Sequence, residues 1–279
     1  MKEILILIQC ADQRGLVASI AKLLASYSLN IEAMREYVDM EASLFFARIA
    51  CSGFLLDENL LLNDLREKLP KQASIIINPS SPKKLAVLVT KEYHCLADIL
   101  SQNFFKSPEI EVCAVIGNHD YLRGFTETFN VPYYHVKSED KPKEMFEEEI
   151  LQILDRYQPD YLVLAKFMRI LTSKFLDRYP NKVINIHHSF LPAFAGAHPY
   201  RRAFERGVKL IGATAHFVTS ELDAGPIISQ QTIKIDHTYT VPQMVEAGQE
   251  VEKTVLNRAL NLVARNQVFI SGNKTVVFE

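Results

Sequence analysis

The residues best suited to catalysis lie in one segment, residues 183–226. Asn185 and His187 are two positions apart at the end of a predicted strand, so their side chains leave an extended backbone on the same face. Asp223 follows a second predicted strand and precedes Ala-Gly-Pro. Because ligands of open α/β sheets bind at the carboxyl ends of the strands, we expect this amide, imidazole and carboxylate to converge.

The chemistry that this trio suits is attack on a formyl carbon. The Asn185 amide can donate a hydrogen bond to a developing oxyanion, a contribution worth roughly a hundred- to a thousandfold in rate. His187 can supply a second donor or a proton, and Asp223 can position a nucleophile and accept its proton. The sequence has no GxSxG motif and no cysteine near the trio, so we do not expect a covalent acyl-enzyme.

Each member of the trio also has an ordinary structural interpretation. An Asn at a strand end is often a turn former, and an Asp before Ala-Gly-Pro can be a simple turn acid. The neighbouring histidines, His187 and His188, could be solvated or could bind a metal. Spacing alone therefore leaves the trio as a candidate.

The elements that must position the trio follow a small N-terminal domain. Leu16 to Tyr27 and Leu60 to Leu69 have apolar residues at helical spacing, and four strands are predicted around them, at 3–10, 31–39, 43–51 and 74–78. This βαββαβ order predicts a ferredoxin-like antiparallel sheet with two helices on one face. The polar, proline-containing stretch PSSPKK then indicates a linker. We divide the chain into a first domain (1–80), a linker (81–84) and a second domain (85–279).

The second domain has the alternation of an α/β protein. Short apolar strands separated by helical stretches are predicted at 85–90, 112–118, 160–165 and 182–186, with a weaker strand at 131–136. This pattern predicts a Rossmann-like, mostly parallel sheet with helical crossovers. Further strands are expected at 211–218 and 227–235, and a long helix follows Thr240, a plausible N-cap with Pro242 in the first turn.

Composition narrows the class of protein. The chain has 279 residues with 48% hydrophobic and 23% charged residues and a net charge of -2, which gives no electrostatic sign of a nucleic-acid partner. No apolar run is long enough to span a membrane, and Met1 to Cys10 lacks the features of a signal peptide. The four cysteines are scattered without a CxxC pair, so we expect no disulfide framework, no zinc site and a cytoplasmic location.

Two segments, NIHHSFLPAF and HFVTSELDAGPII, resemble the folate-dependent formyltransferase family. The resemblance assigns catalysis to Asn185, His187 and Asp223. It makes His216 and His188 supporting residues, His188 being a feature of the family's deformylase branch. LAKFMRIL resembles the family's folate loop, which implies that the folate pocket is lined by Met168, Arg169, Ile170, Leu171 and Val218. No cofactor and no metal are implied, because the folate is the substrate.

The first domain resembles an ACT domain, a fold that often binds amino acids at oligomer interfaces. The resemblance implies a homo-oligomer and a possible amino-acid effector site at the predicted turn between the first strand and helix, formed by Asp12, Gln13, Arg14 and Gly15. An ordinary glycine-containing turn explains the same four residues equally well.

The loop after the first strand of the second domain separates a hydrolase from a transferase. Family members that act on a phosphorylated amine have a Gly-rich loop there, whose N–H groups hold the phosphate. Residues 90–95 contain no glycine, and Glu92 would repel a phosphate. We therefore expect hydrolysis of 10-formyltetrahydrofolate to formate and tetrahydrofolate, which supplies formate for purine synthesis and balances one-carbon pools. A formyltransferase to an amine and a non-catalytic amino-acid sensor remain the alternatives.

Overall fold

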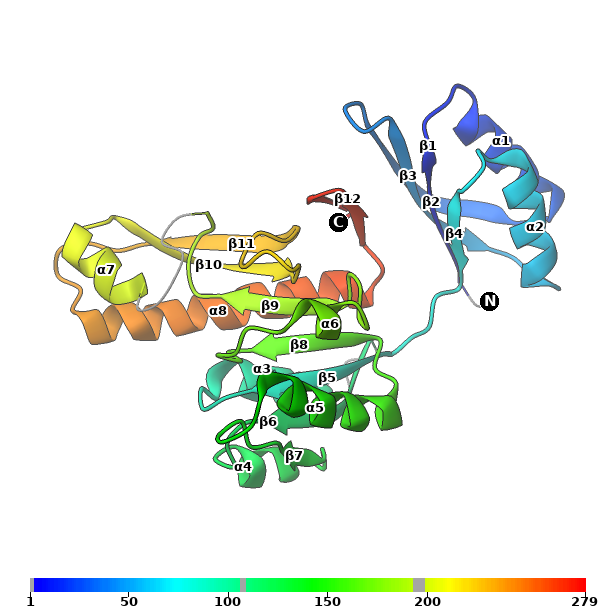
Figure 1. Ribbon diagram of the computed structural model, residues 1–279. Helices are drawn as coiled ribbons and strands as arrows, with labels where there is room; N and C mark the ends of the chain where they lie inside the picture. The colour runs from blue at the N-terminus through cyan, green and yellow to red at the C-terminus, as the bar shows by residue number, and fades with distance from the viewer. Residues whose placement is uncertain (1–2, 106–108, 193–198) are drawn as a thin grey trace. The chain divides into compact units, whose positions relative to one another are not determined.

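The computed structural model describes residues 3–105, 109–192 and 199–279, so the last two residues of the segment NIHHSFLPAF lie outside the described residues. The chain forms two compact units (Figure 1). Unit 1 contains residues 1–80 together with 266–279, and unit 2 contains residues 81–265.

Unit 1 has the predicted βαββαβ order. Its elements are β1 (Ile4–Ala11), α1 (Leu16–Ser26), β2 (Asn30–Asp39), β3 (Leu44–Ser52), α2 (Glu58–Lys68) and β4 (Ser74–Ile77). The strands form an antiparallel sheet in the order β2-β3-β1-β4, which is the ferredoxin-like arrangement. Both helices cover the same face of this sheet (Figure 1).

The two-residue alternation of β1 explains why that face is buried. Ile4, Ile6 and Ile8 point toward the helices and are almost fully buried. They pack against the apolar stripes of α1 and α2, including Leu24 and Leu65. The Asp57 carboxylate caps α2 by accepting hydrogen bonds from the first-turn N–H groups of Asn59 and Leu60.

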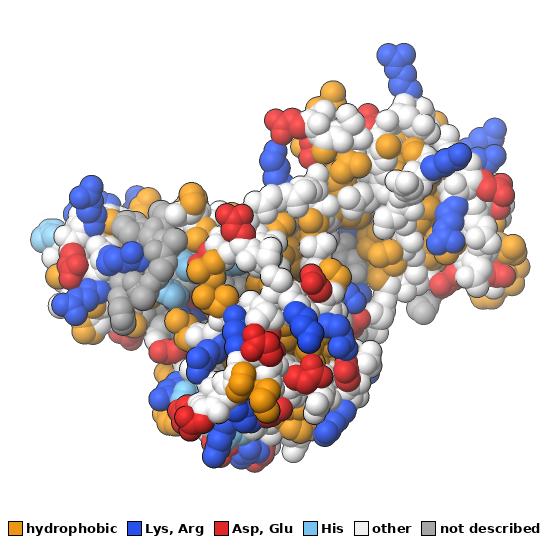
Figure 2. All heavy atoms as spheres, viewed as in Figure 1, with side chains coloured by type: hydrophobic (Ala, Val, Ile, Leu, Met, Phe, Trp, Pro, Cys, Tyr) orange, Lys and Arg blue, Asp and Glu red, His pale blue; other side chains and the backbone are white. Residues whose placement is uncertain are grey.

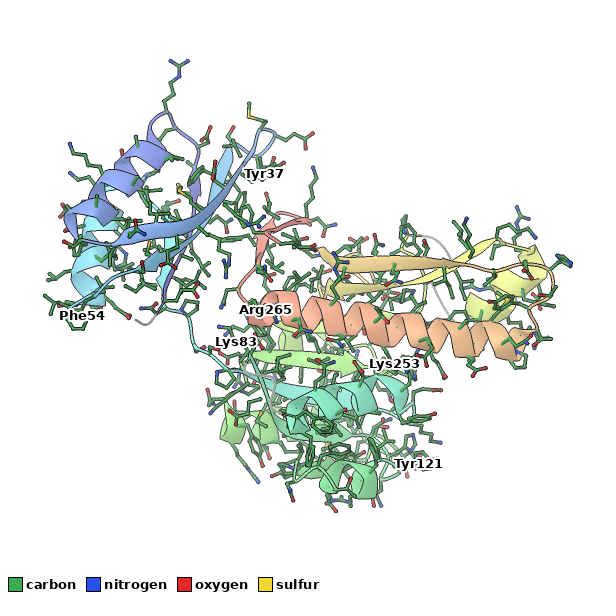
Figure 3. All side chains as sticks on the ribbon, turned by 180° about the vertical axis from the view of Figure 1, so that it is seen from behind. Tyr37, Phe54, Lys83, Tyr121, Lys253 and Arg265 are labelled. Carbon is green, nitrogen blue, oxygen red and sulfur yellow. The ribbon has the colours of Figure 1, made fainter. Side chains whose placement is uncertain are left out.

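The opposite face of the unit 1 sheet is covered by the C-terminal end of the chain. β12 (Val268–Ser271) and β13 (Lys274–Val277) form a hairpin, and the chain enters it from Arg265 at the end of α8 (Figure 3). Phe269 of this hairpin packs edge-on against Phe46 of β3, with ring centroids 5.7 Å apart. Phe278 and Leu7 complete this buried cluster.

This placement differs from the domain division drawn from the sequence. The sequence pattern places residues 266–279 in the second domain, whereas the structure groups them with the first. A short apolar hairpin carries no local information about which sheet it covers, so sequence adjacency to the long helix was misleading. The predicted linker at 81–84 also overlaps a strand, because β5 begins at Lys83.

Unit 2 is an α/β domain with a seven-stranded sheet in the order β11-β10-β9-β8-β5-β6-β7. The strands from β9 to β7 in this order are parallel, and β10 and β11 extend the sheet in antiparallel pairs, so the sheet is mostly parallel as expected. Its strands are β5 (Lys83–Val89), β6 (Ile110–Gly117), β7 (Tyr133–His135), β8 (Tyr161–Ala165), β9 (Val183–His187), β10 (Leu210–Phe217) and β11 (Ile227–Lys234).

The helices of unit 2 connect and cover this sheet. They are α3 (His94–Phe104), α4 (Arg123–Glu127), α5 (Lys143–Tyr157), α6 (Ser173–Leu176), α7 (Pro199–Arg206) and α8 (Val241–Ala264). A capping box of Thr240 and Gln243, with Pro242 in the first turn, begins α8 as the sequence predicts. The chain runs outward from β5 in one direction and returns through β8 in the other, so the topological switch point falls between these two strands.

Two properties concern possible binding partners: the character of the helices and the distribution of charge on the surface. Within the described residues, no helix combines the length and the apolar character needed to cross a membrane. On the face drawn in Figure 2, acidic and basic side chains are interspersed.

The aromatic hairpin generates the first prediction. Phe269→Ala should destabilise unit 1 by about 3 kcal/mol, because it removes a nearly buried ring from the Phe46 and Phe278 cluster. Hydrogen exchange of β1 and β3 amides reports this loss directly, since a chain with two units need not unfold in one transition. Phe54→Ala is the matched control, because Phe54 is 79% exposed in the same unit (Figure 3). Unchanged protection in Phe269→Ala would contradict the packing role of the hairpin.

Candidate active site

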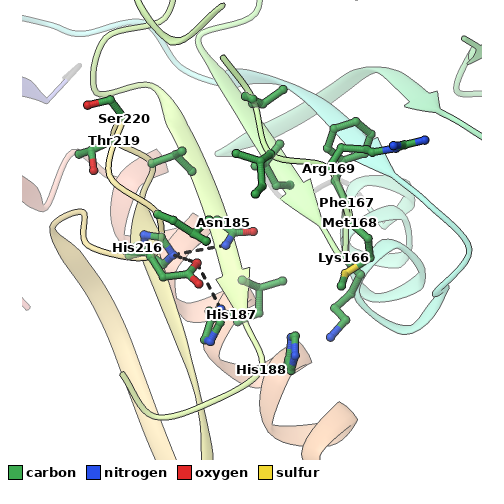
Figure 4. Close-up of a pocket in the computed structure, with 17 residues that line it drawn as sticks. Lys166, Phe167, Met168, Arg169, Asn185, His187, His188, His216, Thr219 and Ser220 are labelled. Atoms are coloured by element: carbon green, nitrogen blue, oxygen red, sulfur yellow. Dashed lines mark hydrogen bonds and ion pairs between the residues drawn. The ribbon is translucent and has the colours of Figure 1, made fainter. Parts of the chain in front are cut away.

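The pairing of β9 with β10 positions the first two functional side chains. The strands are antiparallel, and His216 stands opposite Asn185 in the register. His216 Nδ1 donates to the Phe217 carbonyl oxygen at 2.9 Å, so its Nε2 is the acceptor for the Asn185 amide at 3.3 Å (Figure 4). The second N–H of the Asn185 amide remains available to a ligand.

Asp223 reaches the same place from the loop between β10 and β11. This loop folds back on the end of β10, where Phe217 N–H donates to the Pro226 carbonyl at 2.9 Å. A Cβ at Gly225 would collide with the Phe217 carbonyl oxygen, so the close approach requires glycine. Asp223 itself has a φ of 55°, a left-handed conformation that Asp tolerates better than most residues.

The three predicted catalytic residues therefore lie together. Asp223 Oδ1 accepts from His187 Nδ1 at 3.3 Å and is 3.8 Å from His216 Nε2. The hydrogen bond from His187 lowers the pKa of Asp223 despite partial burial, so the carboxylate stays ionised. His187 Nε2 is buried and has no hydrogen-bond partner among the described residues, which leaves it free for a substrate or water. Burial lowers the pKa of His216, which keeps this histidine neutral.

These residues form one wall of a cavity of about 300 Å³, at the lower end of the usual range for small-molecule sites, roughly 300–1,000 Å³. The opposite wall is the loop after β8, so the predicted folate residues and the trio face one cavity (Figure 4). Met168 and Ile170 are more than half exposed, whereas Leu171 is buried. The cavity is lined by all the predicted folate residues, Met168, Arg169, Ile170, Leu171 and Val218.

Arg169 differs from the other folate-loop residues in its orientation. Its guanidinium donates to Ser138 Oγ at 2.5 Å, away from the trio (Figure 4). Arg169 also borders a second cavity of about 380 Å³ that shares the loop residues 168–171. Lys141, Lys143 and Glu147 also line this second cavity, and the Lys141 ammonium is ion-paired with Glu149 at 2.6 Å.

His188, the predicted supporting residue, packs against the trio through its ring. Its imidazole stacks on His187 with centroids 5.1 Å apart and an interplanar angle of 19°. Burial, assisted by the nearby Lys166 cation, lowers the pKa of His188 to about 4. His188 is therefore neutral at physiological pH.

The sequence interpretation missed a second polar cluster that borders this cavity. It is centred on Glu252 of α8, whose carboxylate is fully buried. His94 Nε2 donates to it at 2.7 Å, Tyr200 OH at 2.6 Å, and Lys166 Nζ lies 3.2 Å away. Although burial opposes ionisation, these partners lower the pKa of Glu252 to about 2. The sequence contained a sign of this cluster, because the acidic residue Glu252 falls at helical spacing on the apolar face of α8 that contains Met244.

Part of this cluster has potential metal ligands. Among the described residues, His94, Cys95 and Glu252 bring ligand atoms within 4.8 Å of one another. The Glu252 carboxylate is already engaged by two hydrogen-bond donors and an ammonium, and burial raises the pKa of the Cys95 thiol well above its usual value. A neutral thiol and an occupied carboxylate are poor ligands, so this cluster does not favour a metal.

The four possible effector residues belong to unit 1. Asp12, Gln13, Arg14 and Gly15 form the exposed turn between β1 and α1, where the sequence placed them. Gly15 begins α1 with a φ of 88°, which suits glycine.

The fold and the trio together define a class of protein, since the formyl transferase family matches residues 83–260. A formyltetrahydrofolate deformylase of Haemophilus influenzae is 48% identical across 98% of both chains, and one of Escherichia coli K12 is 47% identical across 96% of this chain and 95% of its own. The chain belongs to the formyl transferase family, in the group of the formyltetrahydrofolate deformylases.

Solved structures give the same grouping. The crystal structure of a formyltetrahydrofolate deformylase from Pseudomonas syringae has a TM-score of 0.94 and 38% identity, and the match covers 100% of this chain and 95% of that one. A glycinamide ribonucleotide transformylase from Symbiobacterium toebii has a TM-score of 0.67 and 29% identity, with 71% of this chain and 94% of that chain covered.

Proposed function

We propose that this protein hydrolyses 10-formyltetrahydrofolate to tetrahydrofolate and formate. The observation that carries the proposal is the His187–Asp223 pair at the wall of the cavity, in which Asp223 holds Nδ1 of the ring and Nε2 has no partner among the described residues. The names of the full-length relatives support the same reaction.

The reaction follows from the positions of these groups. Water attacks the formyl carbon, and a C–O bond forms while the His187–Asp223 pair takes one proton from the water. The Asn185 amide donates to the developing oxyanion, since one of its N–H groups is not used by His216. The C–N bond then breaks with its electron pair on N10 of the folate. N10 receives a proton from the His187–Asp223 pair, and formic acid loses its remaining acidic proton to leave as formate.

The two adjoining cavities suit the two ends of a folate. The cavity beside the trio has apolar side chains from the loop after β8, which suit a pterin ring. The second cavity has Lys143 and Arg169, whose cationic side chains suit the carboxylates of the glutamate end, whereas Lys141 is ion-paired with Glu149. Both cavities share residues 168–171, so one extended ligand can occupy them together.

Water rather than an amine is the proposed acceptor. The loop between β5 and α3 lacks the glycines of a phosphate-binding loop, and Glu92 in it lies 3.8 Å from His94 Nδ1. A negative side chain there opposes a phosphorylated amine.

The direct test is an assay without any acceptor. Purified protein should release formate and tetrahydrofolate from 10-formyltetrahydrofolate in equal amounts, and a chelator should not change the rate. Formate can be measured with a coupled dehydrogenase, and tetrahydrofolate by its absorbance. Formyl transfer only after the addition of an amine such as glycinamide ribonucleotide would show that the hydrolase proposal is wrong.

Asp223→Asn should separate binding from turnover. The amide cannot accept a proton, so kcat should fall by roughly 10²- to 10⁴-fold. KM should change little, because the loop of residues 168–171 supplies most of the proposed folate contacts. Asp177→Asn is the control, an exposed aspartate next to α6. Near-normal turnover in Asp223→Asn would remove this carboxylate from the mechanism.

For unit 1 we propose the role of an ACT-like regulatory and assembly module. It contributes none of the proposed catalytic residues, and its β2 is an edge strand of ten residues with backbone groups able to pair with another copy. An amino-acid effector would meet the exposed turn at Asp12 to Gly15. We also propose that the protein is a cytoplasmic homo-oligomer. The formate that it releases would supply purine synthesis.

The effector proposal can be tested on the full chain. Amino acids added singly to the formate assay should include one that changes the rate about fivefold or more. Arg14→Ala should abolish that response and preserve the basal rate, whereas Lys22→Ala, an exposed control on α1, should retain it. If no amino acid changes the rate, the regulatory role lacks support.

A further inference from the structure

Lys166 occupies a position that its sequence context does not explain. It directly follows Ala165, the last residue of the buried strand β8. β8 and β9 are parallel and pair Leu164 with Asn185. Lys166 is two residues beyond Leu164, and His187 is two residues beyond Asn185, so the two residues lie at the same level at the carboxyl ends of neighbouring strands.

The backbone at Lys166 is also unusual. Its φ is 60°, a left-handed conformation in which glycine is free of strain and a β-carbon is unfavourable. Lysine at this position is therefore less favourable for the fold than glycine would be. An unfavourable residue at the wall of a catalytic cavity points to a function for its side chain.

The side chain is held in place by the buried cluster around Glu252. Its Nζ is 3.2 Å from Glu252 Oε2, and the side chain is only 11% exposed. Glu252 also accepts from His94 and Tyr200, so the carboxylate is fully engaged and fixed. A Cβ at Gly248 would collide with the Tyr200 ring, so glycine in the interior of α8 makes room for this donor.

The ammonium has hydrogen-bonding capacity left for a ligand. Of its three N–H donors, one is directed to Glu252, and the structure shows no further partner for it in the described parts of unit 2. Lys166 lines the same cavity as Asn185, His187 and Asp223, and in Figure 4 its side chain extends toward His188. His188 is neutral, so Lys166 is the charged member of these two neighbouring side chains.

We propose that Lys166 is a further catalytic residue, whose ammonium, anchored on Glu252, binds the formate anion as it forms and leaves. This inference rests on the hydrolysis proposed above, which produces a one-carbon carboxylate between Lys166 and the trio. Asp223 is ionised on the other side of the cavity and repels the formate anion. A cation opposite Asp223 therefore favours movement of the anion away from that carboxylate. Glu252 acts through Lys166 and is a positioning residue.

The left-handed backbone makes a clean test possible. Lys166→Gly removes the ammonium and relieves the strain, but it also takes a partner from the buried Glu252 carboxylate, so the variant should fold and melt below the parent while kcat falls by roughly a hundredfold. Lys166→Met keeps the backbone conformation and part of the side-chain volume, and its kcat should fall similarly. Lys166→Arg retains the positive charge and should keep more activity than either. Gln158→Gly is the control, because Gln158 has a φ of 48° at the end of α5, away from the cavity.

Binding of formate itself gives a readout that does not depend on turnover. Sodium formate titrated calorimetrically into the parent protein saturated with tetrahydrofolate should bind, and Lys166→Gly and Lys166→Met should weaken that binding about tenfold or more. If the parent protein does not hydrolyse the substrate yet binds formate through Lys166, the hydrolase proposal fails and the anion site stands. Hydrolysis and formate binding within about threefold of the parent in both variants would overturn the role of Lys166 and leave the hydrolase proposal intact.

Discussion

The antiparallel pairing of β9 with β10 is the constraint on which the site depends. It sets His216 opposite Asn185 and fixes the orientation of the amide through a histidine whose other nitrogen is bound to the backbone. The same strand ends in the loop that carries Asp223, and Gly225 permits that loop to close on Phe217. A slip of one residue in this pairing would turn Asn185 and His187 away from the cavity, because side chains alternate across a sheet.

Two ionised carboxylates serve the site in different environments. Asp223 is at the cavity, shares a hydrogen bond with His187 and is available to the reaction. Glu252 is fully buried, has three polar partners and organises Lys166 from behind. Removing a partner from such a buried carboxylate costs several kcal/mol, so the Glu252 cluster is rigid. Both carboxylates remain ionised at neutral pH, so the two differ in burial and not in charge.

Unit 1 is built from both ends of the chain. The C-terminal hairpin covers Leu7 and Phe46 on the sheet face that the two helices leave open. The Ser271 hydroxyl donates to Asp39 at 2.9 Å, and Lys274 forms an ion pair with Glu41, so the hairpin is also joined to the turn between β2 and β3. Two covalent connections therefore link the units, one at Ser80 and one at Arg265. Unit 1 therefore joins residues that are far apart in the sequence, which gives it a high contact order.

The sequence by itself determined the elements and the identity of the trio. Periodicity predicted the βαββαβ unit and the parallel strands, because the side-chain repeats of two and 3.6 residues are local properties. Asn185 and His187 could be paired because they share one strand, Asp223 joined them because it follows the end of a second strand, and the resemblance to a known family assigned catalysis to all three. The structure alone decided the partners of Lys166, since β8, α3, α7 and α8 must all be in place before His94, Tyr200 and Glu252 meet. It also decided that residues 266–279 complete the first unit, because burial of an apolar face depends on distant surfaces and leaves no local pattern.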